Sequence, residues 1–395
     1  MLIGFVGKPS VGKSTFFKAA TLSEVEIASY PFTTVKPNHG VGYVKIDCLD
    51  REFETQCNPN HGFCINHQRF VPVDLMDVAG LVPGASEGKG LGNQFLDDLR
   101  QADVFIQVID ISGTTDEGGK STENYDVSKD IAFLEEELNK WFLGILIKVW
   151  KSFARKAELE ETNFARAVAN QFSGLKVNEE QVKSVLLKLN LPSRPSTWNN
   201  EQLLQFASGL RKESKPMIIA ANKMDMPQGK ENYEKLKKKF PDLRIIPCSA
   251  DSELALREAA KVGLIDYIPG ERNFEIKGKL NDKQKNALDK IKENILDNFE
   301  YGTGVQEVLN YAVFNLLGYL AIFPAGAHKL ADSKGKVLPD CFLLPPNSTA
   351  LDFAYFLHTD FGKNFLRAID ARTKKILGKD YKLKNRDALE IVTSK

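Results

Sequence analysis

The feature that most constrains the fold is a glycine-rich loop between an apolar run and a helical pattern. Residues 7–14 read GKPSVGKS and fit the pattern G-x-x-x-x-G-K-S/T. The apolar run at residues 2–6 predicts a strand before the loop, and Phe16, Phe17 and Ala20 predict a helix after it. This order predicts an α/β fold: a P-loop NTPase domain with a mainly parallel sheet.

The loop has the chemistry of a phosphate-binding site. Glycines let the backbone curl so that its N–H groups face phosphate oxygens, and the helix N-terminus adds the positive end of its dipole. We expect Lys13 to reach the β- and γ-phosphates and Ser14 to hold Mg²⁺ through its hydroxyl. The residues expected to contact the nucleotide here are Gly7, Lys8, Pro9, Ser10, Val11, Gly12, Lys13, Ser14 and Thr15.

A D-x-x-G motif follows the next predicted strand. The apolar run at residues 70–76 ends at Asp77, and the motif closes at Gly80. Asp77 is expected to orient a water on Mg²⁺, and the Gly80 N–H is expected to contact the γ-phosphate. The glycine-rich stretch at 84–92 is predicted to be a switch that orders with the γ-phosphate, and the alternative is an ordinary surface loop.

A threonine pair lies on the loop YPFTTVKPN at residues 30–38. We expect Thr34 to complete the Mg²⁺ shell when the γ-phosphate is present. The expected catalytic residues are therefore Lys13, Thr34 and Gly80, and the expected Mg²⁺ ligands are Ser14 and Thr34.

Two short motifs after later strands select the base. The expected base-binding residues are Asn222, Lys223, Asp225, Ser249 and Ala250. Asp225 can accept hydrogen bonds from N1 and N2 of guanine, a donor pair that adenine lacks. Asn222 would bond N7 or tie its loop to the phosphate loop, the Lys223 stem would lie over the base, and the Ala250 N–H would meet guanine O6. The ordered set of motifs predicts GTP as the ligand.

Helical periodicity marks an insertion inside this domain. After a buried-type strand at 104–110, apolar residues such as Ile131 and Leu134 recur at helical spacing. Trp141 and Trp150 are expected in the core of this segment, and an RNA stacking platform is the alternative. From about residue 320 the pattern turns to strands. The expected domains are the P-loop GTPase domain at 1–127 and 213–319, the helical insertion at 128–212 and a C-terminal domain at 320–395.

At this point the chain resembles the Obg-like GTPases, specifically the YchF-related group. The resemblance implies a C-terminal TGS domain with a β-grasp fold, and association with the ribosome. It is carried by GKPSVGKST at 7–15, YPFTTVKPN at 30–38, DVAGLVPGASEGKGLGNQFL at 77–96, HTD at 358–360 and IDA at 369–371.

Two departures refine what the resemblance implies. Many YchF-type proteins have lost N-K-x-D and prefer ATP, whereas this chain keeps Asn222 and Asp225 and so resembles the GTP-reading branch of archaea and fungi. Leu81 stands where many switch GTPases place a water-orienting glutamine, so hydrolysis is expected to be slow. The alternatives are a YchF-type ATPase and a nucleotide-gated RNA- or ribosome-binding module with negligible turnover.

A cysteine- and histidine-rich stretch lies between the threonine loop and D-x-x-G. Such clustering in a cytosolic chain suggests a structural Zn²⁺ site, although the order matches no common zinc finger. The alternatives are cysteines that pack as small apolar groups, or a disulfide. The candidate Zn²⁺ ligands are Cys48, Cys57 and Cys64 with His61 or His67.

The composition limits the kinds of partner and compartment that are expected for this chain. The net charge of +1 provides no general attraction to nucleic acid, so RNA or ribosome binding would need local basic patches such as Lys363, Arg367, Arg372, Lys374 and Lys375. No apolar run reaches the roughly 18 residues of a membrane span. Five cysteines, an odd number, indicate a reduced, cytoplasmic compartment. We expect a monomer that binds GTP and GDP.

Overall fold

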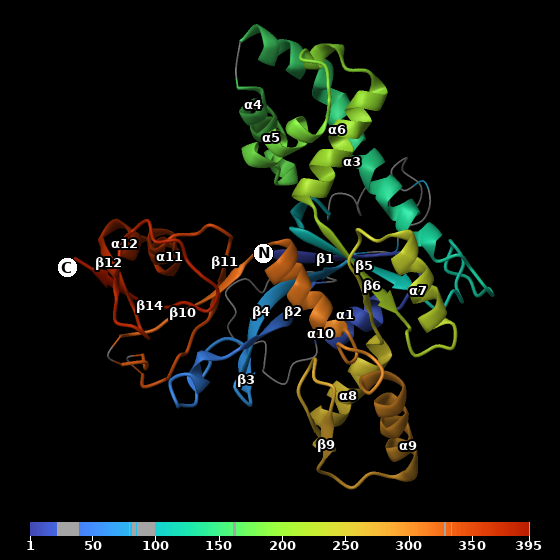
Figure 1. The fold of residues 1–395 in the computed structure, drawn as a ribbon, viewed down its shortest axis with the longest axis vertical. Helices are drawn as coiled ribbons and strands as arrows, with labels where there is room; N and C mark the ends of the chain where they lie inside the picture. The colour runs from blue at the N-terminus through green and yellow to red at the C-terminus, as the bar shows by residue number, and fades with distance from the viewer. Residues whose placement is uncertain are drawn as a thin grey trace. The chain divides into compact units, whose positions relative to one another are not determined.

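The computed structural model describes two compact units of the chain (Figure 1). The first unit holds the described parts of Met1–Leu22, Lys36–Gly40 and Asp74–Val308, and the second holds those of Val41–Val73 and Leu309–Lys395. The described residues are 1–21, 39–78, 80, 84, 99–160, 163–327, 329–332 and 334–394. This division places residues 41–73 with the C-terminal segment, which the predicted domain boundaries did not anticipate.

A parallel sheet with the order β4–β1–β5–β6–β7 forms the centre of the first unit. β5 is buried along its whole length, as expected for a strand covered on both faces. Because the strands are parallel, their carboxyl ends meet at one edge, where open α/β sheets bind ligands. The strands are β1 (Leu2–Val6), β4 (Gln68–Asp77, of which Asp74–Asp77 pair with β1), β5 (Val104–Asp110), β6 (Met217–Asn222) and β7 (Ile245–Pro247).

Helices surround this sheet and form the insertion between β5 and β6. Three of them begin with an Asn-x-x-Gln capping box, in which each side chain bonds the backbone N–H of the other residue, starting at Asn178, Asn199 and Asn281. The helices are α1 (Lys13–Thr21), α3 (Ser128–Leu159), α4 (Phe164–Gln171), α5 (Glu179–Lys188), α6 (Asn200–Ser214), α7 (Gly229–Lys239), α8 (Ala250–Lys261), α9 (Asp282–Ile291) and α10 (Val305–Asn310). A small hairpin, β8 (Ile265–Tyr267) and β9 (Phe274–Ile276), lies between α8 and α9.

Aromatic side chains fill the core of the insertion, where α3 and α6 run side by side (Figure 1). The rings of Trp150 and Trp198 stack with centroids 5.3 Å apart. The indole N–H of Trp150 donates to the Pro195 carbonyl at 3.1 Å, and that of Trp198 donates to the Pro192 carbonyl at 2.8 Å. Trp141 is also buried, so the prediction that these tryptophans are core residues is confirmed.

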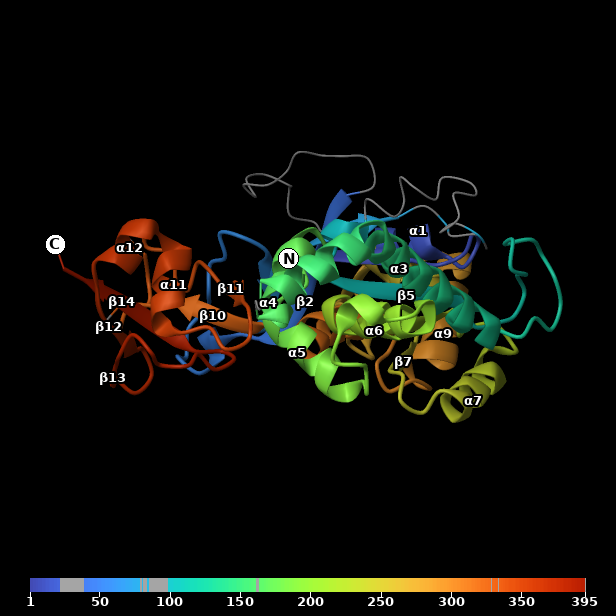
Figure 2. The same cartoon turned by 90° about the horizontal axis from the view of Figure 1, so that it is seen from above.

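The second unit contains a five-stranded sheet with the order β11–β10–β14–β12–β13. β10 and β14 are parallel, and the other pairs are antiparallel. Figure 2 shows α11 and α12 beside this sheet, and Phe353 of α11 packs with Ile322 and Leu389 in its core. The elements are β10 (Leu320–Pro324), β11 (Phe342–Leu344), α11 (Ala350–Leu357), α12 (Thr359–Lys363), β12 (Phe365–Asp370), β13 (Ile376–Leu377) and β14 (Ala388–Thr393).

A strand excursion completes the second unit. It consists of β2 (His39–Asp47, which belongs to this unit from Val41 onward), the short helix η1 (Leu49–Arg51), β3 (Phe63–Ile65) and the first part of β4. Hydrogen bonds from the Asn58 and Asn60 N–H groups to the Val337 and Pro339 carbonyls, both 2.8 Å, join this excursion to the C-terminal segment. These bonds explain why residues 41–73 group with the C-terminal part. Across the described ranges, no helix is both long and apolar enough to span a bilayer.

Candidate functional site

The loop between β1 and α1 lies at the carboxyl edge of the parallel sheet, and two of its positions accept only glycine. A Cβ on Gly12, whose φ is +85°, would lie 2.3 Å from Asn222 Nδ2. A Cβ on Gly7 would lie 2.5 Å from the Val108 carbonyl oxygen of β5. The loop is therefore packed against β5 and the end of β6, and its backbone can approach a ligand closely.

Lys13 and Ser14, at the start of α1, both contact Asp77 at the end of β4. Lys13 Nζ forms an ion pair with Asp77 Oδ1, and Ser14 Oγ donates to Asp77 Oδ2 at 3.0 Å. Gly80 also approaches this loop, because a Cβ there would lie 3.1 Å from Pro9 N. The predicted phosphate-loop and D-x-x-G residues thus lie together.

Magnesium fits the chemistry of this group. The Ser14 hydroxyl and the Asp77 carboxylate are hard oxygen donors, the ligand type that Mg²⁺ takes in nucleotide sites. Thr34, the other expected ligand, lies outside the described residues, as do Leu81 and residues 85–98 of the glycine-rich stretch. Gly84 is described, and its N–H donates to Glu137 Oε1 of α3 at 3.0 Å.

Lys8 is held by residues that follow β5. Its Nζ donates to the Thr115 carbonyl at 2.8 Å, pairs with Asp130 at 2.9 Å and lies 4.0 Å from the centroid of the Tyr125 ring. Burial raises the pKa of Asp130, and the Lys8 hydrogen bond offsets only part of that rise. In this structure the Lys8 side chain therefore contacts Thr115, Asp130 and Tyr125, and its contact with nucleotide stays a prediction.

Asn222, the last residue of β6, links the phosphate loop to the start of α8. Its Nδ2 donates to the Val11 carbonyl at 2.9 Å, and its Oδ1 accepts from the Ala250 N–H at 2.9 Å. Two roles were predicted for Asn222, a bond to N7 of the base and a tie to the phosphate loop. The structure shows the tie to the phosphate loop. The Ala250 N–H, expected to face guanine O6, is directed to Asn222.

Lys223 and Asp110 form a second tie, and sequence reasoning missed Asp110. Lys223 Nζ donates to the Ser10 carbonyl at 2.9 Å and to Asp110 Oδ2 at 2.7 Å. Burial raises the pKa of Asp110, but hydrogen bonds from Lys223, Ser112 and Thr115 outweigh it and hold the pKa below its usual value. A carboxylate at the carboxyl end of a fully buried strand was the signal that could have identified it.

Asp225 stands at the open end of the same loop. Its side chain is exposed, and one oxygen, Oδ1, accepts from Ser249 Oγ at 2.8 Å. Ser249 Oγ also lies 2.8 Å from Ser252 Oγ. This bond holds the carboxylate in one orientation while leaving its exposed face to a ligand.

The cysteine-rich stretch forms a separate cluster in the second unit. The ligating atoms of Cys48, Asp50, Cys57 and Cys64 all lie within 4.8 Å of one another. Hydrogen bonds from the thiols of Cys48 and Cys64 lower the pKa of Cys57 to about 4. His61, a predicted ligand, is not in this group, and Asp50, which was not predicted, is. All five cysteines are free thiols, so the disulfide alternative is wrong.

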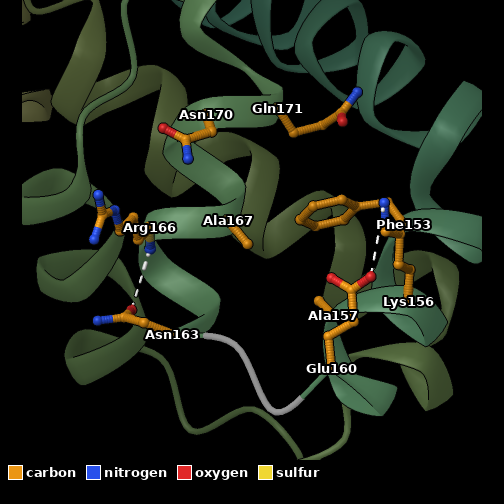
Figure 3. Close-up of a pocket in the computed structure, with 9 residues that line it drawn as sticks. All are labelled: Phe153, Lys156, Ala157, Glu160, Asn163, Arg166, Ala167, Asn170 and Gln171. Atoms are coloured by element: carbon orange, nitrogen blue, oxygen red, sulfur yellow. Dashed lines mark hydrogen bonds and ion pairs between the residues drawn. The ribbon is translucent and has the colours of Figure 1, made fainter.

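A pocket of about 560 Å³ lies in the helical insertion (Figure 3). Polar groups that line it pair with one another: Lys156 Nζ lies 3.8 Å from Glu160 Oε1, and the backbone N–H of Arg166 donates to Asn163 Oδ1. No predicted nucleotide-binding residue lines this pocket. Its lining residues are Phe153, Lys156, Ala157, Glu160, Asn163, Arg166, Ala167, Asn170 and Gln171.

Three protein-family models match the chain. The 50S ribosome-binding GTPase model matches residues 2–148, and the TGS domain model matches residues 332–393. Between them, the model described as Obg-like GTPase YGR210-like, G4 motif-containing domain matches residues 220–326.

Relatives match over nearly the whole chain. An uncharacterized GTP-binding protein of Methanocaldococcus jannaschii is 48% identical over 100% of this chain and 99% of its own length. An uncharacterized GTP-binding protein of Schizosaccharomyces pombe is 38% identical over 89% of this chain and 88% of its own. The ribosome-binding ATPase YchF of Bacillus subtilis is 29% identical over 92% and 87%.

Solved structures agree with these matches. A GTP-binding protein from Pyrococcus horikoshii has a TM-score of 0.79 and 41% identity, covering 100% of both chains. The Schizosaccharomyces pombe YchF GTPase, at 18% identity and a TM-score of 0.58 over 99% of this chain and 97% of its own, shares the fold. The predicted fold class is confirmed: a P-loop domain with a mostly parallel sheet, a helical insertion and a C-terminal TGS domain.

Proposed function

This chain belongs to the Obg-like, YchF-related GTPase family, and from that premise we propose that it is a GTP-binding switch with slow, Mg²⁺-dependent hydrolysis that acts with the ribosome or RNA. The observation that carries the proposal is the pair of ties from Asn222 and Lys223 to the phosphate loop, with Asp225 held beside them. These contacts set the base-reading loop at a fixed position relative to the phosphates.

Guanine selection rests on Asp225. Its carboxylate is exposed and oriented by Ser249, so it can accept from both N1–H and N2–H of guanine. Adenine has no such donor pair, and a site built around a hydrogen-bonding partner discriminates strongly against a ligand that lacks it. The aliphatic part of the Lys223 side chain would pack against the face of the base. Its ammonium would stay hydrogen-bonded to the Ser10 carbonyl and to Asp110.

Phosphate binding rests on an exchange of partners at Lys13. In the structure the Lys13 ammonium is paired with Asp77, and the β- and γ-phosphates would compete for it with a larger negative charge. The N–H groups of the loop and the Gly80 N–H would bind the remaining phosphate oxygens. Ser14 and Thr34 would hold Mg²⁺, with Asp77 orienting its water; the bound ion would neutralise charge that develops on the phosphates.

Slow turnover follows from the residue after Gly80. Leu81 has no hydrogen-bonding group, so it cannot orient the attacking water as a glutamine does. We therefore assign the water-positioning group to a partner or to another residue of the chain. Lys13 and the Gly80 N–H supply the charge stabilisation that remains.

A ribosomal partner is supported by family descriptions. The N-terminal model is that of a 50S ribosome-binding GTPase, and a relative is named ribosome-binding ATPase. Two of the basic residues expected to meet RNA have internal partners: Arg372 pairs with Glu52 at 2.6 Å, and Lys374 Nζ donates to the Ala371 carbonyl at 2.7 Å. The exposed members of the patch are Lys363, Arg367, Lys374 and Lys375, and Arg372 is half-buried.

The decisive test is a titration of GTP and ATP, each with Mg²⁺, against the protein and the Asp225→Ala variant. We expect GTP to bind at least about 100-fold more tightly than ATP, a difference of about 2.7 kcal/mol, and the variant to lose that preference. Asp242→Ala, an exposed aspartate between α7 and β7, is the matched control and should keep it. Equal affinities, or an ATP preference indifferent to Asp225, would contradict the guanine assignment and place the chain with ATP-using relatives.

Turnover is measured on the same samples with and without ribosomes. Slow GTP hydrolysis that ribosomes accelerate is expected. Tight GTP binding with no hydrolysis in either condition would instead identify a nucleotide-gated binding module.

A further inference from the structure

The thiol cluster of the second unit has the spacing of a zinc ligand set. Cys48 Sγ and Cys57 Sγ are 3.6 Å apart, and Cys64 Sγ lies 3.8 Å from Asp50 Oδ2. A disulfide would hold two sulfurs at about 2.05 Å. Tetrahedral zinc with Zn–S bonds of about 2.3 Å places its ligand atoms about 3.8 Å apart. The four side chains are therefore arranged around a common centre rather than bonded in pairs.

The four side chains lie on one short segment of the chain, residues 48–67, and a backbone hydrogen bond holds the two ends of this segment together. Cys48 follows β2, Asp50 lies in η1, Cys57 lies in the next loop and Cys64 lies in β3. The Cys48 N–H donates to the His67 carbonyl at 2.7 Å, which closes the base of the excursion. Cys48, Asp50 and Cys57 are buried, so an ion among them would be shielded from water.

Both oxygens of the Asp50 carboxylate have hydrogen-bond partners besides the sulfurs. His67 Nδ1 lies 2.9 Å from Asp50 Oδ1, and the Cys57 N–H donates to Asp50 Oδ2 at 3.1 Å. Ligating groups of metal sites are held in this way by an outer ring of hydrogen bonds. His67, which the sequence offered as a ligand, is therefore a positioning residue for Asp50.

A buried cation beside the cluster provides independent support. Arg69 is fully buried, and its Nη atoms donate to the Leu338 and Pro339 carbonyls at 3.1 and 2.9 Å, while Nε has no partner. Among the residues that the structure describes, no carboxylate lies within ion-pair distance of this guanidinium. Arg69 lies directly opposite Cys64 in the antiparallel pair of β3 and β4. A buried guanidinium without a counter-ion is costly, and a metal-bound set of thiolates would supply the missing negative charge.

We propose that Cys48, Cys57, Cys64 and Asp50 bind one structural Zn²⁺. Three thiolates and one carboxylate carry four negative charges, so a bound Zn²⁺ leaves a net charge of about −2, which Arg69 partly neutralises. Thiolates favour zinc over Mg²⁺ or Ca²⁺, and four protein ligands close the site to substrate. The ion fixes the loop that carries Asn58 and Asn60, whose N–H groups bond the Val337 and Pro339 carbonyls.

The first test is metal analysis of the full chain purified without chelators, followed by incubation with one equivalent of Zn²⁺ and gel filtration. We expect close to one zinc per chain and five titratable thiols after denaturation with chelator. A ratio near zero after incubation, or two thiols lost to a disulfide, would overturn the proposal. Cobalt substituted into the unaltered protein should give the visible absorption of tetrahedral Co²⁺ and a thiolate-to-cobalt charge-transfer band, and their absence would also overturn it.

Substitutions then identify the ligands. Cys57→Ser and Cys64→Ser should lose zinc, while Cys248→Ser, a buried cysteine after β7 in the first unit, should retain it. Asp50→Ala should also lose zinc, and His67→Gln should bind it about 10- to 100-fold more weakly in competition with a chelator. Equal zinc loss in Cys248→Ser, or unchanged zinc in Asp50→Ala, would show that these four residues are not the ligand set.

Discussion

Asp110 holds Lys223, the residue whose ammonium joins the base-reading loop to the phosphate loop. It accepts from Lys223 Nζ, whose other bond is to the Ser10 carbonyl. Ser112 and Thr115 also donate to it, Thr115 at 2.9 Å, so the buried carboxylate is well partnered. Because a buried charge is tolerated only with such partners, Lys223 and the hydroxyl groups together determine the ionisation of Asp110.

The depressed pKa of Asp110 predicts a specific pH dependence of stability. Its folded pKa lies below the unfolded value of about 3.9, so the carboxylate stabilises the fold above that pH, and this contribution is lost as the pH falls through the folded pKa. Asp110→Asn should cost about 1–3 kcal/mol at pH 7, and the gap to the unaltered protein should narrow between about pH 5 and pH 3. Urea unfolding of the nucleotide-free proteins measures both quantities.

The control for this prediction is Asp289→Asn, an exposed aspartate on α9. Its stability should stay within about 0.5 kcal/mol of the unaltered protein at every pH. A gap between Asp110→Asn and the unaltered protein that stays constant from pH 7 to pH 3 would show that the carboxylate charge is not what stabilises this position.

At the scale of secondary-structure elements, the sequence was enough to predict the features that depend on local residue patterns. The strands before each motif were predictable because apolar runs end at the residues that carry the chemistry, as β5 does at Asp110 and β6 at Asn222. Long-range pairings were not predictable. The bond from Arg69 to the Leu338 carbonyl spans 269 positions, and no local pattern at residues 41–73 indicates that they join the C-terminal part.

The same distinction applies to the candidate site. Motif spacing pointed to Asn222 and Asp225, but the pairing of Lys8 with Asp130 depends on how the segment after β5 returns to the loop. Likewise, the clustering of cysteines and histidines suggested a metal site, whereas the position of Asp50 among the thiols depends on the turn at η1. A side chain's type suggested its chemistry, and tertiary structure determined its partners.

Substitutions in the aromatic core should lower the stability of the insertion more than substitutions elsewhere in it. Trp150 is buried and stacks on Trp198, so Trp150→Ala should lower the unfolding free energy by about 3–5 kcal/mol. Trp150→Phe should cost less, because it keeps most of the packing and loses the hydrogen bond to Pro195. Ile147→Ala, one turn earlier on α3 and 48% exposed, is the control and should cost well under 1.5 kcal/mol. Similar losses for Trp150→Ala and Ile147→Ala in urea unfolding would refute the assignment of this core.

At the scale of the whole molecule, each unit has its own hydrophobic core. The core of the insertion is continuous with that of the nucleotide-binding sheet, since Trp150 belongs to the same cluster as Val6 and Phe105. The second unit has a separate cluster that includes Ile322 and Phe353. All three tryptophans of the chain lie in the first unit, so their fluorescence reports unfolding of that unit alone.

Separate cores and separate ligands predict that each ligand stabilises one unit. GTP with Mg²⁺ at 100 times its dissociation constant should stabilise the transition seen by tryptophan fluorescence by about 2.7 kcal/mol, and ATP at the same concentration should stabilise it by at most about 0.4 kcal/mol. Removing zinc by chelation, in the absence of nucleotide, should leave the fluorescence transition in place and lower a second transition visible only by circular dichroism. Coincident transitions that shift together with either ligand would show that the chain unfolds as one cooperative unit. If the two transitions are distinct, and GTP shifts only the first while zinc shifts only the second, GTP binds the first unit and zinc binds the second.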